Sequence, residues 1–256
     1  MEAQESAMPA ENDGPGPVGP ALQLVADTTA QPIVPQEPSK LAELPDWGYL
    51  LREFYEMYRN SGAGGSEAIR RHQRRVREAI SRTMTSNPRI LPRKREDKPV
   101  TRHLKRALDE GRLERTAPFI RAIESVVADL SWLYGYDKVP RGLKDRFAWA
   151  EFAGPSGPVE TSEVILGIVL FAPGCTYPAH AHNGIHESYF VLSGSVSEND
   201  DGVFAPGSMI FNPPGRRHRI TVGDREPALL AYAWSGTEES LAGQKLKFTR
   251  PKAAAT

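Results

Sequence analysis

The sequence predicts a mainly β protein in which a helical N-terminal layer precedes a jelly-roll barrel. Three observations lead to this fold class. Residues 1–40 are rich in proline and contain no aromatic side chain, apolar residues recur three and four apart from about residue 45 to 136, and short β-rich runs follow Pro140. We therefore divide the chain into a disordered tail at 1–40, a helical region at 41–140 and a barrel at 141–250.

Composition excludes several classes of function. Of the 256 residues, 39% are hydrophobic and 25% are charged, which is typical of a folded, water-exposed protein. Lys plus Arg equals Asp plus Glu at 32 each, so no net charge draws the chain onto nucleic acid or an anionic membrane. The one cysteine, Cys175, excludes an intrachain disulfide and a thiolate-rich zinc site.

The location is expected to be cytoplasmic and the protein soluble. No apolar run approaches the roughly 20 residues that span a membrane. The acidic start of the chain lacks the basic-then-apolar order of a secretory signal. We therefore expect neither a membrane nor a nucleic acid as partner.

The predicted tail holds seven prolines, at positions 9, 15, 17, 20, 32, 35 and 38. Such a segment cannot bury enough apolar area to offset the conformational entropy that ordering would cost. The helical layer is expected to start after it, with Asp46 as the N-cap of the first helix and the glycines at 62–65 as its end. Its apolar face is formed by Trp47, Leu50, Leu51, Phe54 and Tyr58.

A second helix is predicted from Ser66 to about Met84. Its apolar stripe is thin and consists of Ile69, Val76 and Ile80. Its arginines are Arg70, Arg71, Arg74, Arg75, Arg77 and Arg82. Glutamates are interspersed and no aromatic residues interleave, which favours a solvated helix face over a nucleic-acid surface.

Two further helical stretches and a set of strands follow. One helix is expected near 101–111 and a longer one from Pro118 to about Tyr134, with Ile120, Ile123, Val126, Val127, Leu130 and Leu133 on its apolar face. Glycines and prolines then separate β-rich runs at 164–171, 188–192, 208–212 and 228–234. Short runs at this interval indicate an antiparallel barrel or sandwich.

Candidate metal ligands are concentrated in the barrel. His180 and His182 are two apart and share a face of a strand, as do Glu187 and Tyr189 after a turn at 183–184. His218 follows a Pro-Gly turn and supplies a third imidazole. Three imidazoles and one carboxylate suit Zn(II), Fe(II), Mn(II), Ni(II) or Cu(II), with positions left open for substrate or water.

Two nearby residues are expected to lie outside this group. His186 precedes Glu187 directly and therefore faces the opposite side of its strand, where a surface or interface position is favoured. Cys175 is out of phase with His180 and His182, and we interpret it as a small core residue.

These residues resemble the two cupin motifs. The first, G-x5-H-x-H-x4-E-x6-G, fits Gly174 through Gly194 at every fixed position. The second, G-x5-P-x-G-x2-H-x3-N, fits Gly207 through His218, and Val222 stands in place of its final Asn. The resemblance implies a cupin-type double-stranded β-helix with one divalent metal ion.

The sequence around the motifs resembles the cupin-type dimethylsulfoniopropionate (DMSP) lyases, over roughly residues 115–236. The similar runs lie at 150–157, 166–174, 177–180, 187–189 and 229–236. A helical layer before the barrel is also similar to that family. The resemblance implies a small-molecule substrate, DMSP, from which an α-proton is removed so that dimethyl sulfide leaves and acrylate remains.

The resemblance also implies roles for aromatic residues. Tyr189 is expected to be the base that takes the α-proton, and Tyr177 to bind or assist the substrate. A divalent metal ion coordinating the substrate carboxylate would act as a Lewis acid and stabilise the negative charge that develops beside that carboxylate. The sulfonium would contact an aromatic wall through cation–π interactions of about 0.5–2 kcal/mol, for which Tyr177, Tyr232 and Trp234 are candidates. Tyr232 and Trp234 are equally consistent with ordinary barrel core.

Two other classes of function remain open. An Fe(II) dioxygenase of a small molecule would use the same ligand set, and a non-catalytic cupin would only bind a ligand. The Glu187-x-Tyr189 pair favours the lyase, because redox chemistry at an open iron site needs no nearby phenolic base. The sequence leaves the native metal and the oligomeric state open, a homodimer being one option.

Overall fold

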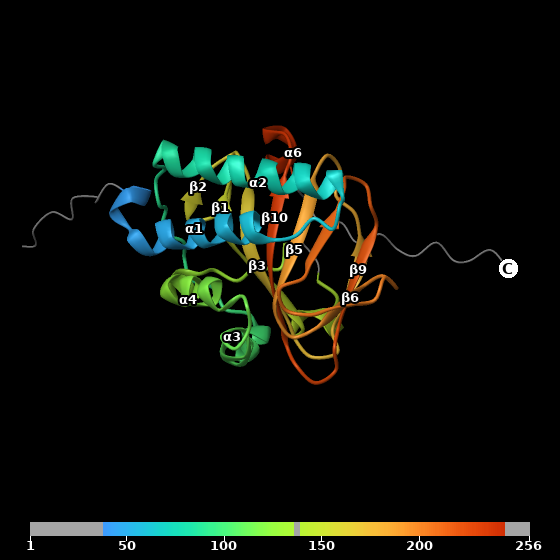
Figure 1. The fold of residues 1–256 in the computed structure, drawn as a ribbon. Coiled ribbons are helices and arrows are strands. Elements are labelled where there is room, and N and C mark those ends of the chain that lie inside the picture. The colour runs from blue at the N-terminus through green and yellow to red at the C-terminus, as the bar shows by residue number, and fades with distance from the viewer. Residues whose placement is uncertain (1–37, 136–138, 244–256) are drawn as a thin grey trace, which may run out of the picture. The chain divides into compact units, whose positions relative to one another are not determined.

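The structure is a computed structural model that describes residues 38–135 and 139–243. Most helices precede the strands along the chain, and one short helix follows them (Figure 1), which confirms the mainly β fold class with its helical N-terminal layer. The predicted disordered tail lies outside the described residues, except for 38–40, where Lys40 forms a β-bridge with Arg89. Among the described residues, no helix is both long enough and apolar enough to cross a membrane.

The first four α-helices of the described chain lie on one side of the strands (Figure 1), whereas the last two, both short, contribute Leu143 and Leu241 to the apolar core between the sheets. The α-helices are α1 (Pro45–Asn60), α2 (Glu67–Ser86), α3 (Leu104–Gly111), α4 (Ala117–Val126), α5 (Arg141–Lys144) and α6 (Glu238–Ala242). Short 3-10 helices are η1 (Leu41–Glu43), η2 (Pro99–His103) and η3 (Val127–Asp129).

The first helix has the expected apolar face; in the second, Val76 and Ile80 are buried as expected, whereas Ile69 is only half-buried. In α1 the five predicted residues are the buried ones, but the predicted N-cap is wrong: the helix begins at Pro45 and Leu44 is its N-cap. Proline fits the first helical position because its missing N–H needs no partner there, which places Asp46 inside the first turn. Ser66 caps α2 as predicted, since its hydroxyl accepts a hydrogen bond from Ile69 N at 3.3 Å.

The fourth predicted helix is shorter than expected. It ends at Val126, continues as η3 and becomes extended at Leu130. Beyond that point Leu133 pairs with Trp149 through two backbone hydrogen bonds of 2.8 and 3.0 Å. Pairing with a strand therefore outweighs the helical spacing of Leu130 and Leu133, which is a tertiary effect that periodicity does not contain.

The described strands form two sheets. The larger has the order β2-β1-β3-β10-β5-β8 and the smaller β4-β9-β6-β7. Their bounds are β1 (Phe147–Gly154), β2 (Val159–Glu160), β3 (Ile165–Phe171), β4 (Thr176–His180), β5 (His186–Ser193), β6 (Val196–Glu198), β7 (Val203–Phe204), β8 (Met209–Asn212), β9 (His218–Val222) and β10 (Ala228–Ser235). The four predicted β-rich runs correspond to β3, β5, β8 and β10.

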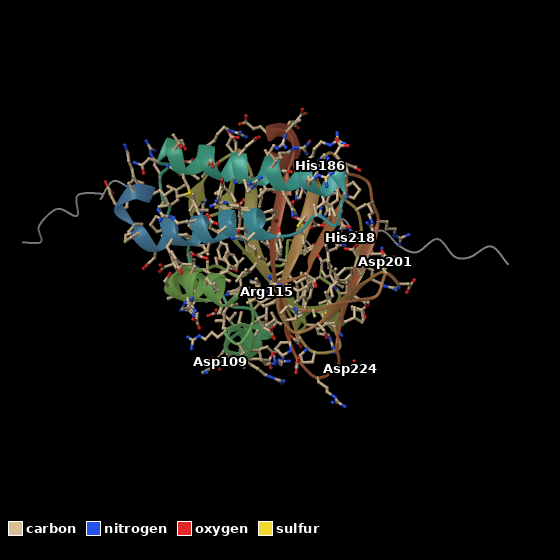
Figure 2. All side chains as sticks on the ribbon, viewed as in Figure 1. Asp109, Arg115, His186, Asp201, His218 and Asp224 are labelled. Carbon is tan, nitrogen blue, oxygen red and sulfur yellow. The ribbon has the colours of Figure 1, made fainter. Side chains whose placement is uncertain are left out.

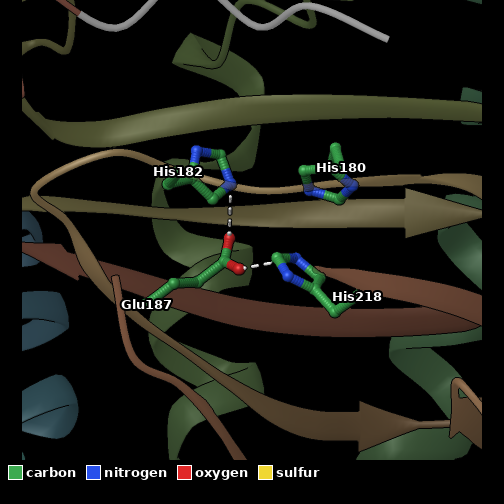
Figure 3. Close-up of side chains that lie close together, drawn as sticks. All are labelled: His180, His182, Glu187 and His218. Carbon is green, nitrogen blue, oxygen red and sulfur yellow. Dashed lines mark ion pairs between the residues drawn. The ribbon is translucent and has the colours of Figure 1, made fainter. Parts of the chain in front are cut away.

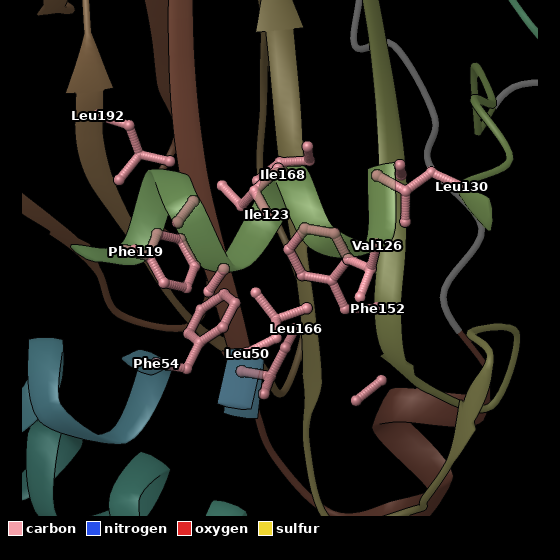
Figure 4. Packing of buried hydrophobic residues seen from close by; sticks show 14 of the residues in the cluster. Leu50, Phe54, Phe119, Ile123, Val126, Leu130, Phe152, Leu166, Ile168 and Leu192 are labelled. Atoms are coloured by element: carbon pink, nitrogen blue, oxygen red, sulfur yellow. The ribbon is translucent and has the colours of Figure 1, made fainter. Parts of the chain in front are cut away.

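Two apolar cores lie on opposite faces of the larger sheet. One packs helices against its outer face, where Leu50 and Phe54 of α1 meet Phe119 of α4 and Phe152 of β1 (Figure 4). The other fills the space between the two sheets and includes Val169, Tyr189 and Ile220. Strand β3 is buried along its whole length because both of its faces are covered, which explains its nearly continuous apolar sequence.

Candidate metal centre and substrate pocket

His180, His182, Glu187 and His218 come together in the structure (Figure 3). All four are buried, and their ligand atoms lie within 4.8 Å of one another. His186 lies apart from them, toward α2 (Figure 2). The group that the sequence singles out is therefore one buried cluster whose donors could hold a metal ion.

The two sheets contribute to the cluster from opposite sides. His180 ends β4 and is in register with His218, the first residue of β9, in the smaller sheet. Glu187 is in β5 of the larger sheet. His182 follows β4 rather than belonging to it, and its carbonyl accepts a hydrogen bond from Gly215 N at 2.8 Å. That bond fixes the loop after β4 against the Pro-Gly turn before His218.

Backbone carbonyls orient two of the imidazoles. Nδ1 of His180 lies 3.0 Å from the carbonyl of Pro178, and Nδ1 of His218 lies 3.2 Å from that of Arg216. If each Nδ1 carries the proton that it donates to its carbonyl, the lone pair is on Nε2. A hydrogen bond from the far ring nitrogen to a backbone carbonyl is usual for metal-binding histidines, because it fixes the orientation of the ring.

The charges in the cluster favour a cation at its centre. Glu187 faces Nε2 of His218 at 2.8 Å and Nε2 of His182 at 3.5 Å. Burial raises the pKa of Glu187, but the two imidazoles outweigh it and hold the carboxyl pKa well below its usual range. Burial lowers the pKa of His180 to about 4, so this imidazole is neutral near pH 7. A neutral imidazole and an ionised carboxylate are the forms that bind metals.

Two further side chains hold Glu187. Nε1 of Trp234 donates to Glu187 Oε1 at 2.7 Å, and the Asn212 amide donates to Glu187 Oε2 at 3.4 Å and to Glu198 Oε2 at 2.9 Å. Trp234 thus contacts the cluster directly, a role that the sequence interpretation did not give it. Asn212 was missed, although it is a polar residue in a β-rich run and is in register with Glu187.

The two residues expected outside the cluster lie outside it. His186 is half-buried between α2 and the sheet, and its Nδ1 accepts a hydrogen bond from Arg75 at 2.9 Å. Cys175 is fully buried in the core between the sheets, where burial raises its pKa to about 11. The arginines of α2 are mostly exposed, as expected of a solvated face.

A pocket of about 130 Å³ opens beside the cluster. His180 contributes to its wall, together with Tyr177, Tyr189, Tyr232 and Trp234. The aromatic side chains proposed from the sequence are therefore brought to one cavity. Trp149 and Glu151 of β1 also line it, and the sequence analysis assigned no role to either.

Burial sets the ionisation of the polar groups in the pocket. The pKa of Tyr189 is raised well above its ordinary value by burial and by the Glu187 carboxylate, and that of Tyr232 is raised by burial and by Glu151. Burial raises the pKa of Glu151 to about 7. A phenolate of Tyr189 therefore requires a neighbouring positive charge, which a metal ion in the cluster would provide.

Fold and cluster together define a cupin with three histidines and a glutamate between its two sheets. The family model for dimethylsulfoniopropionate lyase matches residues 72–230 of this chain. The chain is 48% identical over 218 residues to a protein of Cereibacter sphaeroides provisionally named dimethylsulfoniopropionate lyase DddL, covering 85% of this chain and 94% of that one. The protein belongs to the DMSP lyase family.

Two solved structures are similar in fold. The DMSP lyase DddQ from Ruegeria pomeroyi DSS-3 aligns with a TM-score of 0.61 at 20% identity, over 82% of this chain and 98% of that one. A chain from the crystal structures of the DMSP lyases RdDddP and RnDddQII aligns with a TM-score of 0.59 at 21% identity, over 80% and 98%. At these identities the likeness establishes a common fold.

Proposed function

We propose that the protein cleaves DMSP to dimethyl sulfide and acrylate, with one divalent metal ion held by His180, His182, Glu187 and His218. The observation that carries the proposal is that His180 of this cluster forms part of the wall of a small aromatic pocket that is also lined by three tyrosines. Membership of the DMSP lyase family supports the same substrate.

A divalent ion bound there would supply Lewis-acid stabilisation for the negative charge that develops next to the substrate carboxylate. The cluster fits such an ion because it offers three imidazoles and a buried carboxylate, with two imidazoles oriented by backbone carbonyls. Trp234 and Asn212 keep the Glu187 carboxylate in place through their hydrogen bonds.

Tyr189 is the proposed base. It is two residues beyond Glu187 on the same face of β5, and its ring centroid lies 6.3 Å from that of His218. The Tyr189 phenolate takes the α-proton, a double bond forms between the α- and β-carbons, and the electron pair of the C–S bond leaves with dimethyl sulfide. Tyr177, whose ring lies 5.0 Å from that of His180, is proposed to orient the substrate.

The rings of Tyr177, Tyr232 and Trp234 line the same pocket and are proposed to contact the sulfonium. The cytoplasmic location, a homodimer and the division of the chain at residues 40 and 140 remain predictions. So does the identity of the metal among Fe(II), Zn(II), Mn(II) and Ni(II).

The proposal is tested by incubating the protein with DMSP without oxygen, after loading with each of these metals in turn. Dimethyl sulfide in the headspace and an equal amount of acrylate in solution are expected. Turnover that requires oxygen and consumes it would instead indicate a dioxygenase. Binding of DMSP with no product under any metal would indicate a ligand-binding cupin.

A further inference from the structure

Glu151 is a buried carboxyl in the substrate pocket for which the proposed mechanism has no use. Its exposed fraction is 8%, and it lines the same cavity as His180 and Tyr189. A buried carboxyl costs free energy unless it is paired, so its presence in an aromatic pocket calls for a partner.

The sheet register places Glu151 in one row with two pocket tyrosines. Glu151 of β1 is opposite Gly167 of β3, Gly167 is opposite Tyr232 of β10, and Tyr232 is opposite Tyr189 of β5. Neighbouring strands are about 4.8 Å apart, so the backbones of Glu151 and Tyr189 are separated by roughly 14 Å. Both side chains extend into the cavity, which leaves a span between them suited to a small molecule.

Two glycines make room for this arrangement. A Cβ at Gly154 would lie only 2.3 Å from Glu151 Oε1, and one at Gly167 would lie 2.5 Å from the Tyr232 hydroxyl. Glu151 Oε1 accepts a hydrogen bond from Ser156 N at 2.9 Å. The carboxyl is thus held in a backbone cradle at the end of the pocket away from the metal cluster.

Two buried polar groups beside Glu151 have no hydrogen-bond partner in the part of the chain that the structure describes. Among the described residues, Nε1 of Trp149 and the hydroxyl of Tyr232 are buried and make no hydrogen bond. The two rings lie edge to face, with centroids 6.4 Å apart. Aromatic rings next to a carboxyl form a surface that favours an organic cation, through cation–π attraction and direct charge pairing.

We propose that Glu151, with the rings of Trp149 and Tyr232, binds the positively charged onium end of the substrate. This rests on the proposed function, which places the substrate carboxylate at the metal cluster. The pocket then has a cationic end and an anionic end, and it selects small zwitterions in one orientation. The sequence analysis expected a purely aromatic wall around the cation. In this proposal Glu151 is instead the main determinant of charge specificity.

Binding of the onium group requires the ionised form of Glu151. The groups that face this carboxyl are the backbone N–H groups of Ser156 and Gly157, the Arg93 guanidinium and the Tyr232 phenol. Burial outweighs them and raises the pKa of Glu151 to about 7. The preference for a cationic ligand should therefore grow as the pH rises through 7 and level off above it.

The test compares two unreactive ligands that differ in charge. 3-(Trimethylammonio)propionate carries a fixed cation, and 4,4-dimethylpentanoate is the isosteric carboxylate without one. Their dissociation constants are measured by calorimetry on the metal-loaded protein and on Glu151→Gln, whose amide oxygen can still accept the Ser156 hydrogen bond. Glu160→Gln is the matched control, because it removes the same charge from an exposed position on neighbouring β2.

Glu151→Gln should reduce the preference for the ammonium ligand over 4,4-dimethylpentanoate at least about tenfold at pH 8 and abolish the pH dependence of that preference. Glu160→Gln should leave both unchanged. An unchanged preference in Glu151→Gln, or an equal loss of affinity for both ligands, would overturn the proposal. If Glu151→Gln does not fold, Glu151→Met provides the same comparison.

The outcome also separates this inference from the lyase reaction. If the wild-type protein makes no dimethyl sulfide but shows the Glu151-dependent preference, the onium subsite is supported and the lyase function is rejected. If the wild-type protein makes dimethyl sulfide but lacks this preference, the lyase function is supported and the onium subsite is rejected.

Discussion

Glu187 is the residue on which the proposed centre depends, because two imidazoles, an indole and an amide all contact its carboxylate. Its opposite charge keeps the pKa of His218 above the ordinary value, although burial alone would lower it. In such a centre the removal of one ligand leaves the others mispositioned and incompletely coordinated.

The metal assignment predicts opposite results for two histidines. His218→Ala should abolish stoichiometric metal binding, because it removes a donor that faces Glu187 at 2.8 Å. His186→Ala should retain full occupancy, because that ring contacts Arg75 instead. Elemental analysis after dialysis measures the bound metal in both variants. Circular dichroism is the control for intact sheets. Full occupancy in His218→Ala, or metal loss in His186→Ala alone, would contradict the assignment.

The proposed base predicts a loss of turnover without a loss of metal. Tyr189→Phe keeps the ring and its packing but removes the oxygen that takes the proton, so kcat should fall at least about a hundredfold. Tyr177→Phe should act mainly on KM if that residue only orients the substrate. Both variants are compared with wild type by their initial rates of dimethyl sulfide release and by their metal content. Near-normal turnover in Tyr189→Phe would make Tyr177 the next candidate.

The raised pKa of Glu151 predicts that the stability of the folded protein depends on pH. Its pKa rises from 4.5 in the unfolded chain to about 7 in the folded protein, so the folded state binds more protons between these values. Stability contributed by the neutral carboxyl is present below pH 4.5 and is lost as the pH rises to about 7. At 1.36 kcal/mol per pKa unit the loss is on the order of 3 kcal/mol.

Glu151→Gln cannot titrate and should escape this loss. The free energy of unfolding of the variant, relative to wild type, should therefore increase between pH 4 and pH 8 by up to about 3 kcal/mol. Urea denaturation at several pH values, with the same metal content in both proteins, measures the difference. A difference that does not change with pH would show that the carboxyl is not protonated in the folded state.

At the scale of elements, strand β5 connects the helical layer to the metal cluster. Glu187 and Tyr189 face the pocket, while Ser188 between them faces the helices. Its hydroxyl lies 2.6 Å from the Tyr58 hydroxyl of α1 and 2.7 Å from His72 Nε2 of α2. Burial lowers the pKa of His72 to about 3, so this ring is neutral and the contact is a hydrogen bond between neutral groups.

The close packing of β1, β3 and β10 predicts opposite effects for two glycine substitutions. A Cβ at Gly167 would lie 2.3 Å from the Ala150 carbonyl, so Gly167→Ala should destabilise the protein by about 1–3 kcal/mol and displace Tyr232. A Cβ at Gly48, inside α1, meets nothing within 4 Å, so Gly48→Ala should stabilise by about 0.5–1 kcal/mol. The melting temperatures of the two variants test this prediction. Equal changes in melting temperature would contradict the strand register at Gly167.

At the scale of the whole molecule, helices α1 to α4 pack on one face of the larger sheet, and the other face forms the core and the pocket, to which α5 and α6 contribute Leu143 and Leu241. Strands of the larger sheet contribute side chains to both cores, so the helical layer and the barrel form one folding unit. Residues 38–41 belong to this unit, because Ser39 O accepts a hydrogen bond from Ile90 N at 2.7 Å and Leu41 N donates to Pro88 O at 2.9 Å.

A chain that starts at Pro38 should keep both activity and stability. The preceding residues have the composition of a segment that cannot fold by itself. We expect a melting temperature and a kcat/KM within error of the full chain. Removal of residues 38–40 as well should lower the melting temperature, since the contacts of Ser39 and the Lys40 bridge with Arg89 are lost. A large loss on removal of 1–37 would show that the tail contributes to the site or to an assembly.

The sequence by itself determined the helical layer before the strands, the apolar face of α1, and the four members of the buried His/Glu cluster. These features depend on local spacing: three to four residues for a helix face, two for a strand face, and a fixed interval around a turn. The cluster members could be grouped because His180, His182 and Glu187 are close in the chain and His218 follows a recognisable turn.

Only the tertiary structure decided which residues share the pocket and where the fourth helix ends. Glu151 and Trp149 meet Tyr232 through strand pairings across some 80 residues of chain, and Leu133 leaves the helical pattern because Trp149 pairs with it. Ser188 and His72 meet from different layers. Such contacts depend on sheet order and register, for which local periodicity carries no information, because loop lengths and long-range packing set them.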